Sequence, residues 1–414
     1  MSPKSILVVA ESIDIDDSSG SKANVALIRN LQEAGYGLHI FHYTRKNIQL
    51  NGIECLNIPE NRKSPNFFLS RIQRKLQHWF NWNLAKYLEP KFGFSFTFFN
   101  DTKSIQEAIR KLNPQDFDFV LTLSKGASFR PHFALLQIPE FHSRWMAYIH
   151  DPYPFHYYPE PYKWSEPGFE HKIEFFRKLS EKCRWAAFPS KLLKEWMTGK
   201  FPGFKDKSII IPHQLNEKDS SLKEIPEYLD GDKFNLLHAG NLMKQRSPFP
   251  LIEAFQQFLK NNPKARTESR LLLIGNASFH EKEIEKFTNG LEQILVKKYL
   301  DFDKMRILQK SVSVNIILES VAEISPFLPG KFPHCIEAEK PILLLGPTKS
   351  ESRRLLGEGY PYWAKANEVN EIAEKINGLY QLWRKKGKDL RMLRPDLKEY
   401  MSFSHLEETL EKLA

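Results

Sequence analysis

Short runs of aliphatic and β-branched residues alternate with longer amphipathic stretches along almost the whole chain of 414 residues. This alternation is typical of βαβ units, in which a helix returns the chain so that the next strand runs parallel to the last. The runs form two series, separated by a polar segment, residues 216–233, that is rich in Ser, Pro and charged residues. The sequence therefore predicts an α/β protein with two Rossmann-like domains, each built on a parallel sheet.

Each series supplies five expected strands and three expected helices. In the first, strands are expected at Ile6–Ala10, Leu38–Tyr43, Phe119–Leu123, Trp145–Ile149 and Trp185–Phe188, and helices near Lys22–Ala34, Ile105–Leu112 and Ile173–Lys182. In the second, strands are expected at Phe234–Ala239, Leu271–Ile274, Arg306–Leu308, Val314–Leu318 and Ile342–Leu345, and helices near Pro250–Leu259, Glu281–Lys297 and Ile372–Leu382. The expected domains are residues 1–215 and 234–390, with a linker at 216–233 and a C-terminal helix at 391–414 that returns toward the first domain.

The positive charge of the chain is concentrated in two segments. The formal net charge is +10, and residues 62–91 alone carry seven basic residues against one acid. Residues 384–398 carry seven basic residues against two acids, so the rest of the chain has a net charge near −1. The first segment also has helical periodicity, with Phe68, Ile72 and Trp79 on one stripe. Such a helix could either dock on an anionic membrane surface or pack its apolar face on its own domain.

Four phenylalanines follow this basic segment with a period of two. Phe92, Phe94, Phe96 and Phe98 alternate with smaller residues, a pattern that predicts a strand with the four rings on one face. Core packing is the favoured explanation for these rings.

Other function classes receive little support from the sequence. Three cysteines, Cys55, Cys183 and Cys335, lie far apart and indicate neither a disulfide framework nor a zinc site. No signature of a nucleic-acid-binding domain is present, so nucleic acid is not an expected partner. The N-terminal apolar run is too short for a secretory signal, and no apolar stretch is long enough to span a bilayer, so a cytoplasmic protein is expected.

The loops after the strands of the first series contain several candidate site residues. Gly20 would let a ligand approach the backbone closely at the start of a helix. Asp14 and Asp16 form a DxD pair, for which helix capping or solvated charge is favoured over metal binding. His150 lies at the end of the fourth strand and is a candidate hydrogen-bond partner for a substrate hydroxyl or a general acid or base.

Two loops of the second series carry cations suited to an oxyanion. After the first strand of that series, Gly240 makes a turn, and Lys244 and Arg246 follow before a helix. Further along the chain Ser325, Gly330 and Lys331 precede a short helix on which His334 and Glu337 lie three residues apart, on one face. Both loops follow strands of one sheet, so we expect them to form a single anion site.

The segment Pro329–Ile342, PGKFPHCIEAEKPI, resembles the P-x-K-L-F-E-Y-L-A-x-G-K-P-V segment of GT-B glycosyltransferases, especially the retaining family 4. The resemblance covers almost the whole chain in domain order. It implies the GT-B fold, two Rossmann-like domains with parallel sheets facing a central cleft. By this likeness Lys331 and Arg246 would neutralise the donor diphosphate. Gly20 would lie near that diphosphate, and His150 would contact the donor sugar.

The sequence departs from the family pattern at several positions. The family's ribose-binding Glu corresponds to His334, and Pro326 stands where many members have another Glu. Asn241 replaces an Arg that often follows the turn glycine. We therefore expect Glu337, one turn along the helix, to bind the ribose. The expected catalytic residues are His150, Arg246 and Lys331, and the expected donor-binding residues are Gly20, Gly240, Asn241, Lys244, Ser325, Gly330, His334 and Glu337.

The resemblance implies a retaining glycosyltransferase that needs neither metal nor cofactor, with a UDP- or GDP-linked sugar as donor. The expected acceptor is a glycan or a lipid-linked molecule of cell-surface polysaccharide synthesis, and residues 62–91 could place the enzyme peripherally on a membrane. Two alternatives remain: an isomerase like the sugar-nucleotide 2-epimerases, and a catalytically impaired GT-B binding or scaffold protein.

Overall fold

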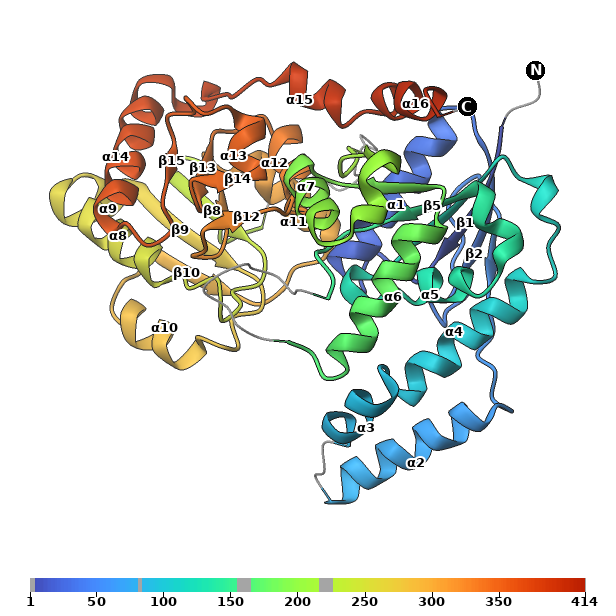
Figure 1. Cartoon of the computed structure of the whole chain (residues 1–414). Coiled ribbons are helices and arrows are strands. Elements are labelled where there is room, and N and C mark those ends of the chain that lie inside the picture. Colours follow the sequence, from blue (N-terminus) through green and yellow to red (C-terminus); the bar gives the residue numbers. More distant parts are fainter. Residues whose placement is uncertain (1–3, 81–83, 155–164, 216–225, 414) are drawn as a thin grey trace. The chain divides into compact units, whose positions relative to one another are not determined.

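A computed structural model describes residues 4–80, 84–154, 165–215 and 226–413 (Figure 1). The chain forms two compact units. Among the described residues, the first unit contains the chain up to Gln214 and the C-terminal residues from Phe403 onward. The second unit runs from Leu215 to Ser402. The predicted linker at 216–233 lies partly outside the described residues, and its remainder, residues 226–233, forms turns and irregular chain.

The first unit is built on a seven-stranded sheet with the order β3-β2-β1-β4-β5-β6-β7, in which every neighbouring pair is parallel. Its strands are β1 (Ser5–Ala10), β2 (Gly37–His42), β3 (Cys55–Asn57), β4 (Phe119–Leu123), β5 (Trp145–Tyr148), β6 (Trp185–Phe188) and β7 (Ser208–Ile210). Its helices are α1 (Ser19–Glu33), α2 (Pro65–Phe80), α3 (Ala85–Phe92), α4 (Phe96–Ile109), α5 (Arg130–Leu136), α6 (Phe169–Lys182), α7 (Lys191–Lys200) and α16 (Phe403–Glu411). Short 3₁₀ turns are η1 (Pro114–Asp116), η2 (Gly126–Ser128), η3 (Pro139–Arg144) and η4 (Pro202–Lys207).

The second unit is built on a six-stranded parallel sheet with the order β10-β9-β8-β11-β13-β15 and a separate parallel pair, β12 with β14. Its strands are β8 (Phe234–Ala239), β9 (Ser269–Ile274), β10 (Ile294–Lys297), β11 (Val314–Leu318), β12 (Ile324–Ser325), β13 (Ile342–Leu345), β14 (Lys349–Ser350) and β15 (Trp363–Ala364). Its helices are α8 (Phe249–Asn261), α9 (Ala265–Glu268), α10 (Glu281–Thr288), α11 (Phe302–Ser311), α12 (Phe332–Glu337), α13 (Glu351–Leu356), α14 (Val369–Lys386), η5 (Gly387–Asp389) and α15 (Pro395–Tyr400).

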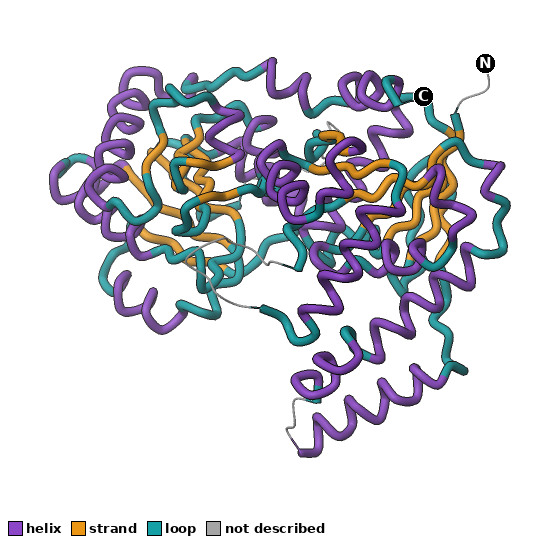
Figure 2. Tube along the Cα trace, viewed as in Figure 1, coloured by secondary structure: helices purple, strands orange, loops and turns teal. Residues whose placement is uncertain are grey.

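Each sheet is covered by helices on both faces, so its central strands are buried on both sides (Figure 2). In β1, Leu7 and Val9 pack in one apolar cluster, whereas Ile6, Val8 and Ala10 pack in another on the opposite face. This is the period of two that a strand imposes on its side chains. The continuous apolar runs of the sequence are therefore the central strands of the two predicted parallel sheets.

The strand predicted from the alternating phenylalanines is wrong. Phe92 ends α3, and Phe96 begins α4, whose first turn is capped by Ser95 Oγ accepting a hydrogen bond from the Phe98 backbone N–H at 3.2 Å. Gly93 makes the turn between the helices with φ of 85°. Two of the small residues in the pattern, Gly93 and Ser95, are thus helix caps. Core packing is confirmed for Phe94 and Phe98, which are buried with ring centroids 4.1 Å apart.

Two predicted elements of the second series are also wrong. Arg306–Leu308 is not a strand but part of α11, which is capped by Asp301 Oδ1 accepting from the Lys304 backbone N–H at 2.9 Å. The missing strand is β10, Ile294–Lys297, which lies inside the stretch predicted as one helix, Glu281–Lys297. Asn289 and Gly290 end the helical pattern there, with Gly290 at φ of 77°.

The C-terminal segment forms two helices where the sequence predicted one. α15 belongs to the second unit, and α16 belongs to the first, where Leu406 and Leu410 are buried in the cluster that also contains Leu27 and Leu31 of α1. The break falls at Met401 and Ser402, where the Met401 carbonyl accepts a hydrogen bond from the Leu215 backbone N–H at 2.9 Å.

Gly20 lies in the first turn of α1, where it packs on the loop after β4. A Cβ atom at this position would lie 2.7 Å from the Gly126 backbone nitrogen. The helix therefore approaches η2 as closely as a glycine allows, and the contact gives Gly20 a packing role whether or not it meets a ligand.

We predict that Gly20→Ala lowers the thermal unfolding midpoint of the protein. Alanine normally stabilises a helix relative to glycine by about 0.5–1 kcal/mol, but overpacking at this contact should cost about 1–3 kcal/mol. Gly199→Ala in α7 is the matched control, because its added Cβ would meet no atom within 4 Å. Equal midpoints for the two variants would show that the contact with η2 does not constrain α1.

Candidate functional site

The strand order of the second sheet reverses between β8 and β11. In open parallel sheets, ligands bind at the carboxyl edge next to such a reversal, because the flanking loops diverge there. Gly240 follows β8 at this edge, and Gly275 follows the neighbouring strand β9. Glu319 follows β11, and Gly346 follows β13.

The glycines at this edge are required by close contacts. Gly240 and Gly275 have φ of 149° and 147°, and a Cβ on Gly275 would lie 2.3 Å from the Gly240 carbonyl oxygen. A Cβ on Gly346 would lie 2.4 Å from Glu319 Oε2. A side chain could therefore not be accommodated at Gly275 or Gly346 without moving its neighbours.

Lys331 reaches this edge from the loop before α12. Its Nζ atom lies 3.3 Å from His238 Nδ1 and would be 3.2 Å from a Cβ on Gly240. Burial, together with repulsion from Arg246, lowers the pKa of Lys331 to about 7, although Cys335 and Glu319 act in the opposite direction. Near neutral pH the ammonium group is therefore partly deprotonated, and an anion bound beside it would favour the charged form.

Arg246 is a second cation at this edge, and we call Lys331 and Arg246 together the cation cluster. Its Nε atom is buried and has no hydrogen-bond partner within the part of the chain that the structure describes. Burial, together with repulsion from Lys331 and Arg246, lowers the pKa of His238 well below its usual value, so that ring is neutral. A buried guanidinium N–H without an acceptor is costly, and a bound oxyanion would satisfy it.

Glu319 is a site residue that the sequence analysis missed. Its Oε1 atom accepts a hydrogen bond from Ser352 Oγ at 2.7 Å, whereas Oε2 is buried with no partner among the described residues. Burial raises the pKa of Glu319 to about 7, although Ser352, Ser350, Arg246 and Ser325 act against this shift. The pairing of β12 with β14 sets Ser325 opposite Ser350, which explains why both reach the carboxyl group.

His334 and Glu337 lie on one face of α12 as predicted, with His334 Nδ1 3.8 Å from Glu337 Oε2. This face is turned to α11, because Glu337 Oε1 pairs with Arg306 and with Lys310 Nζ at 3.0 Å. Burial alone would raise the pKa of Glu337, but the contacts with His334, Arg306 and Lys310 outweigh it and lower the pKa to about 2. The contacts of this pair are thus with α11, whereas Lys331 faces β8.

Asn241, Lys244 and Gly330 are exposed in the loops beside the cluster. Asn241 Oδ1 accepts a hydrogen bond from the Asn276 backbone N–H at 3.2 Å, which ties the loop after β8 to the loop after β9. The structure therefore places Gly240, Arg246, Ser325 and Lys331 together and leaves the three exposed residues at the rim.

In the first unit His150 is buried at the carboxyl end of β5. Asn24 Nδ2 donates to the carbonyl oxygens of Ser12 and Ser124 at 3.2 and 3.1 Å, so its Oδ1 must be the acceptor in the 2.9 Å contact with His150 Nε2. Burial, with the neighbouring His213 and His132, lowers the pKa of His150 well below its usual value. The ring is therefore neutral with its proton on Nε2, and Nδ1 can only accept a hydrogen bond.

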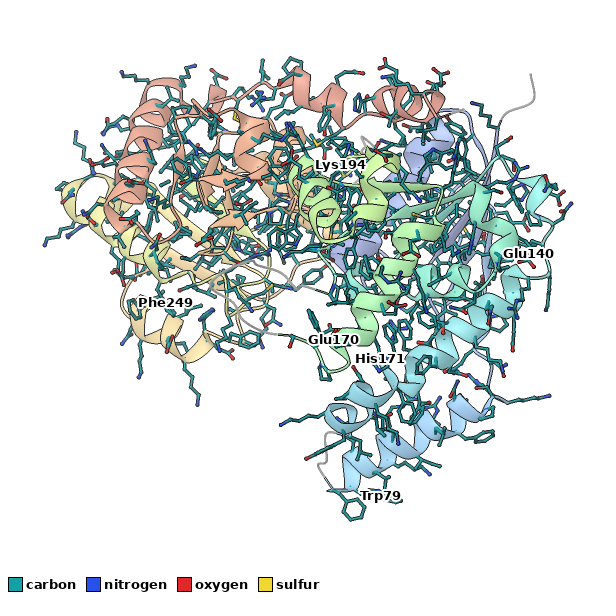
Figure 3. The ribbon with its side chains drawn as sticks, in the orientation of Figure 1. Trp79, Glu140, Glu170, His171, Lys194 and Phe249 are labelled. Carbon is teal, nitrogen blue, oxygen red and sulfur yellow. The ribbon has the colours of Figure 1, made fainter. Side chains whose placement is uncertain are left out.

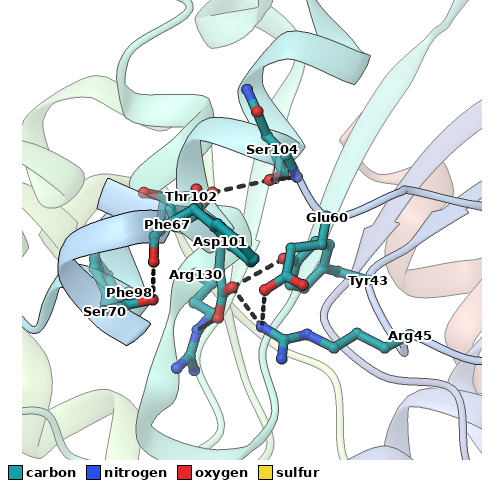
Figure 4. A network of polar contacts seen from close by, with 12 residues as sticks. Tyr43, Arg45, Glu60, Phe67, Ser70, Phe98, Asp101, Thr102, Ser104 and Arg130 are labelled. Carbon is teal, nitrogen blue, oxygen red and sulfur yellow. Dashed lines mark hydrogen bonds and ion pairs between the residues drawn. The ribbon is translucent and has the colours of Figure 1, made fainter. Parts of the chain in front are cut away.

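A second polar network of the first unit was not predicted from the sequence (Figure 4). Asp101 of α4 accepts hydrogen bonds from Tyr43 Oη and Arg130 Nε, both at 2.9 Å, and from Arg45 at 2.6 Å. Arg130 also donates to Glu11 Oε1 at 2.7 Å, directly after β1. This network joins the loops after β1 and β2 to α4 and α5 at the carboxyl edge of the first sheet.

The residues of the DxD pair, Asp14 and Asp16, make local contacts. Asp14 pairs with Lys46, and its Oδ1 accepts from the Asp16 backbone N–H at 3.0 Å. Helix α1 is capped by Ser18, whose Oγ accepts from the Ser21 backbone N–H at 3.1 Å. Among the residues that the structure describes, no group of three or more His, Cys, Asp or Glu could hold a metal ion.

The chain was compared with known proteins. No protein-family model matches it. No curated protein matches it significantly in sequence. Solved structures do match: the Anabaena protein HepE, in a complex with UDP and glucose, is 11% identical with a TM-score of 0.62, covering 99% of both chains. The trehalose-6-phosphate synthase OtsA is 11% identical with a TM-score of 0.66, covering 99% of this chain and 98% of its own.

A sucrose-phosphate synthase from Thermosynechococcus elongatus is 12% identical with a TM-score of 0.62, over 99% of this chain and 98% of its own. These proteins are glycosyltransferases built from two Rossmann-like domains. The chain has the GT-B fold. The fold predicted from the resemblance is thereby confirmed, because full-length similarity at this level requires the same topology in both units. Membership of family 4 stays a prediction.

In this GT-B chain, the cation cluster occupies the switch point of the second Rossmann-like sheet, where the fold places its ligands. The roles of the individual residues stay predictions, including those of His150 and Gly20. The structure restricts two of these roles: burial lowers the pKa of Lys331 to about 7, and the neutral ring of His150 can only accept a hydrogen bond at Nδ1.

We predict that Lys331→Met stabilises the ligand-free protein at pH 6 by about 2–4 kcal/mol. The pKa of about 7 lies below the ordinary value of 10.5, so below pH 7 folding must bury a charge that the unfolded chain keeps in water. The gain should shrink as the pH rises from 7 toward 10.5, where the unfolded lysine also loses its proton. Urea unfolding at pH 6 and pH 9 measures the difference.

Lys244→Met is the matched control, because Lys244 is exposed in the neighbouring loop. Its effect should be small and equal at the two pH values. A Lys331→Met variant that is destabilised at both values would contradict the burial argument.

Proposed function

We propose that the protein is a glycosyltransferase that transfers a sugar from a nucleoside diphosphate donor, and that the cation cluster of its second unit binds the diphosphate. The observation that carries this proposal is the pair Lys331 and Arg246, part-buried beside a neutral histidine, with a guanidinium Nε that has no described acceptor. Similarity in fold to HepE, which was solved with UDP and glucose, supports the same ligand class.

Charge development explains how such a cluster would catalyse transfer. As the glycosidic bond to the donor breaks, negative charge grows on the leaving diphosphate, and fixed cations beside it stabilise the transition state. Lys331 can gain its proton as the anion binds, because its pKa lies near neutrality in the free site. Arg246 Nε would donate to a phosphate oxygen at the same time.

Retention and independence from metal are part of the proposal. The fixed cations would take the place of a divalent ion at the diphosphate, and the leaving phosphate would deprotonate the incoming hydroxyl. His150 would then orient the donor sugar by accepting a hydrogen bond at Nδ1, since its Nε2 proton is committed to Asn24. This role needs no proton transfer by the histidine.

The acceptor and the pathway follow from the resemblance to family 4. We propose a glycan or lipid-linked acceptor of cell-surface polysaccharide synthesis, and a UDP- or GDP-linked sugar as donor. Ribose binding by Glu337 belongs to the same proposal. Unchanged donor affinity in a Glu337→Gln variant would count against that assignment.

Calorimetric titration of UDP, GDP and ADP is the first test. We expect one of these diphosphates to bind the wild-type protein, and Lys331→Ala to weaken its binding by at least tenfold, because a charge-assisted contact of about 1.5–3 kcal/mol is lost. Binding at pH 7 should take up about half a proton, as Lys331 becomes fully charged. Titrations in HEPES and in Tris buffer, which differ in ionisation enthalpy and contain no phosphate to compete for the site, measure that proton.

Affinity should fall as the pH rises above 7, because the charged form of Lys331 and the neutral form of Glu319 are then both lost. Lys260→Ala, an exposed lysine on α8, is the matched control and should bind as the wild type does. Absence of binding by any diphosphate would overturn the donor site and favour the scaffold alternative.

The rate of transfer should be insensitive to metal removal. With the donor sugar that matches the bound base, we expect equal consumption in EDTA and in added Mg²⁺ or Mn²⁺, within about twofold, because the leaving diphosphate already has two protein cations. Proton NMR of the first product should show the anomeric configuration of the donor. An inverted product, or activity that requires the metal, would refute this part of the mechanism.

A further inference from the structure

Helix α2 exposes most of its apolar side chains. Within this helix, which is described from end to end, Ser70 is the only buried residue. Phe68, Ile72 and Trp79 have exposed fractions of 57%, 53% and 68%, and Phe80 has 52%. The alternative in which the helix packs its apolar stripe on its own domain therefore does not describe these side chains. Figure 3 shows Trp79 at the end of α2, pointing away from the ribbon.

The exposed apolar residues form one stripe. With 100° per residue, Phe68, Ile72 and Trp79 project within about 40° of one another around the helix. The exposed side chains of Arg71 and Lys75 lie along one flank of this stripe, whereas Arg74, which is also exposed, lies about 120–160° away around the helix. The helix thus presents rings and cations side by side, an arrangement typical of helices that lie in the headgroup layer of a bilayer.

The helix is held in place by polar contacts and by its packing on α4. Ser64 Oγ accepts from the Phe67 backbone N–H at 3.0 Å and donates to Asn100 of α4. Arg71 lies 3.8 Å from Glu60, which also pairs with Arg45 of the Asp101 network (Figure 4). These contacts fix the helix without covering the stripe, so the stripe stays available to a partner.

Charge decides which partner fits. We call α2 and α3, with the residues before α2, the basic arm (residues 62–80 and 84–91). Residues 62–91 carry seven basic residues and one acid. A second copy of the chain would bring the same positive arm and would be repelled. An anionic bilayer offers opposite charge and an apolar layer for the rings, and tyrosine and tryptophan, here Tyr87 and Trp79, favour that interface.

We infer that the basic arm docks the protein on the surface of anionic lipid bilayers. The stripe of Phe68, Ile72 and Trp79 enters the acyl boundary, and Arg71 and Lys75 beside it bind lipid phosphates. Arg74, on the far side of the helix, adds to the positive potential of the arm. No helix in the described ranges is long and apolar enough to cross a membrane, so the contact is made at the surface. This docking does not depend on the donor site, since the arm and the cation cluster belong to different units.

Co-sedimentation with vesicles tests the inference. The full chain should bind vesicles of phosphatidylcholine with 30% phosphatidylglycerol and should bind pure phosphatidylcholine vesicles weakly. Each basic residue near an anionic surface contributes about 1 kcal/mol, or about fivefold, so Arg71→Glu/Arg74→Glu/Lys75→Glu should lower the partition coefficient by roughly a hundredfold or more. Ile72→Ser/Trp79→Ser should also reduce binding, and high salt should reduce it in the wild type.

A control of equal charge change separates docking from total charge. Lys111→Glu/Lys182→Glu/Lys205→Glu alters three exposed lysines on other elements of the same unit and should leave vesicle binding within about fivefold of wild type. Thermal unfolding of every variant confirms that it is folded.

Three outcomes would overturn the inference. The first is equal binding to neutral and anionic vesicles, and the second is equal loss in the control and the arm variants. The third is a wild-type dimer in solution that the arm variants dissociate, with no vesicle binding, because it would assign the stripe to a second copy. None of these outcomes affects the titrations with nucleoside diphosphates, so the two proposals can fail independently.

Discussion

Two neighbouring cations beside a buried carboxyl group set the character of the second unit. Lys331 and Arg246 share the carboxyl edge of β8, and burial holds the pKa of Lys331 near 7 while leaving His238 uncharged. The carboxyl group in the cluster, Glu319, is itself kept near a pKa of 7 by burial and is bonded to serines. Without a ligand this arrangement costs stability, because like charges lie close together in a poorly solvated place. An oxyanion reverses the balance, since it supplies the charge that the protein withholds.

The glycines around the cation cluster also favour an external anion as its partner. Gly275 packs against the Gly240 carbonyl, and Gly346 packs against Glu319, so the residues directly after β9 and β13 carry no side chain. A carboxylate introduced there would neutralise the lysine permanently and remove its preference for an external anion. The glycines and the neutral histidine are therefore as much a part of the proposed anion site as the cations.

The sequence predicts the parallel sheets and the order of domains because central strands of a doubly wound sheet are short continuous apolar runs, such as Ile342–Leu345, that alternate with longer amphipathic stretches. The prediction of secondary structure is wrong where a pattern of residues is compatible with both a strand and a helix. The alternation from Phe92 to Phe98 is compatible with a strand, and only the caps formed by Gly93 and Ser95 turn it into the junction of two helices. In the site, loop position identified Lys331 and Arg246, whereas the basic arm's exposure could not be predicted, because periodicity alone does not say whether a stripe is covered.

Glu319 and Glu337 differ in a property that the sequence does not predict, the pKa of the carboxyl group. Both are glutamates of the second sheet region, and one is held near a pKa of 7 while the other is held near 2. The difference lies in their neighbours: serine hydroxyls surround Glu319, and Arg306 and Lys310 both bond to one oxygen of Glu337. That leaves Glu337 Oε2, 3.8 Å from the Nδ1 atom of His334, as the oxygen with spare acceptor capacity. His334, at the position of the family glutamate, thus lies beside the carboxylate of Glu337, one turn along the helix. If Glu337 binds the ribose, its Oε2 atom would have to accept the hydrogen bond from the ribose hydroxyl.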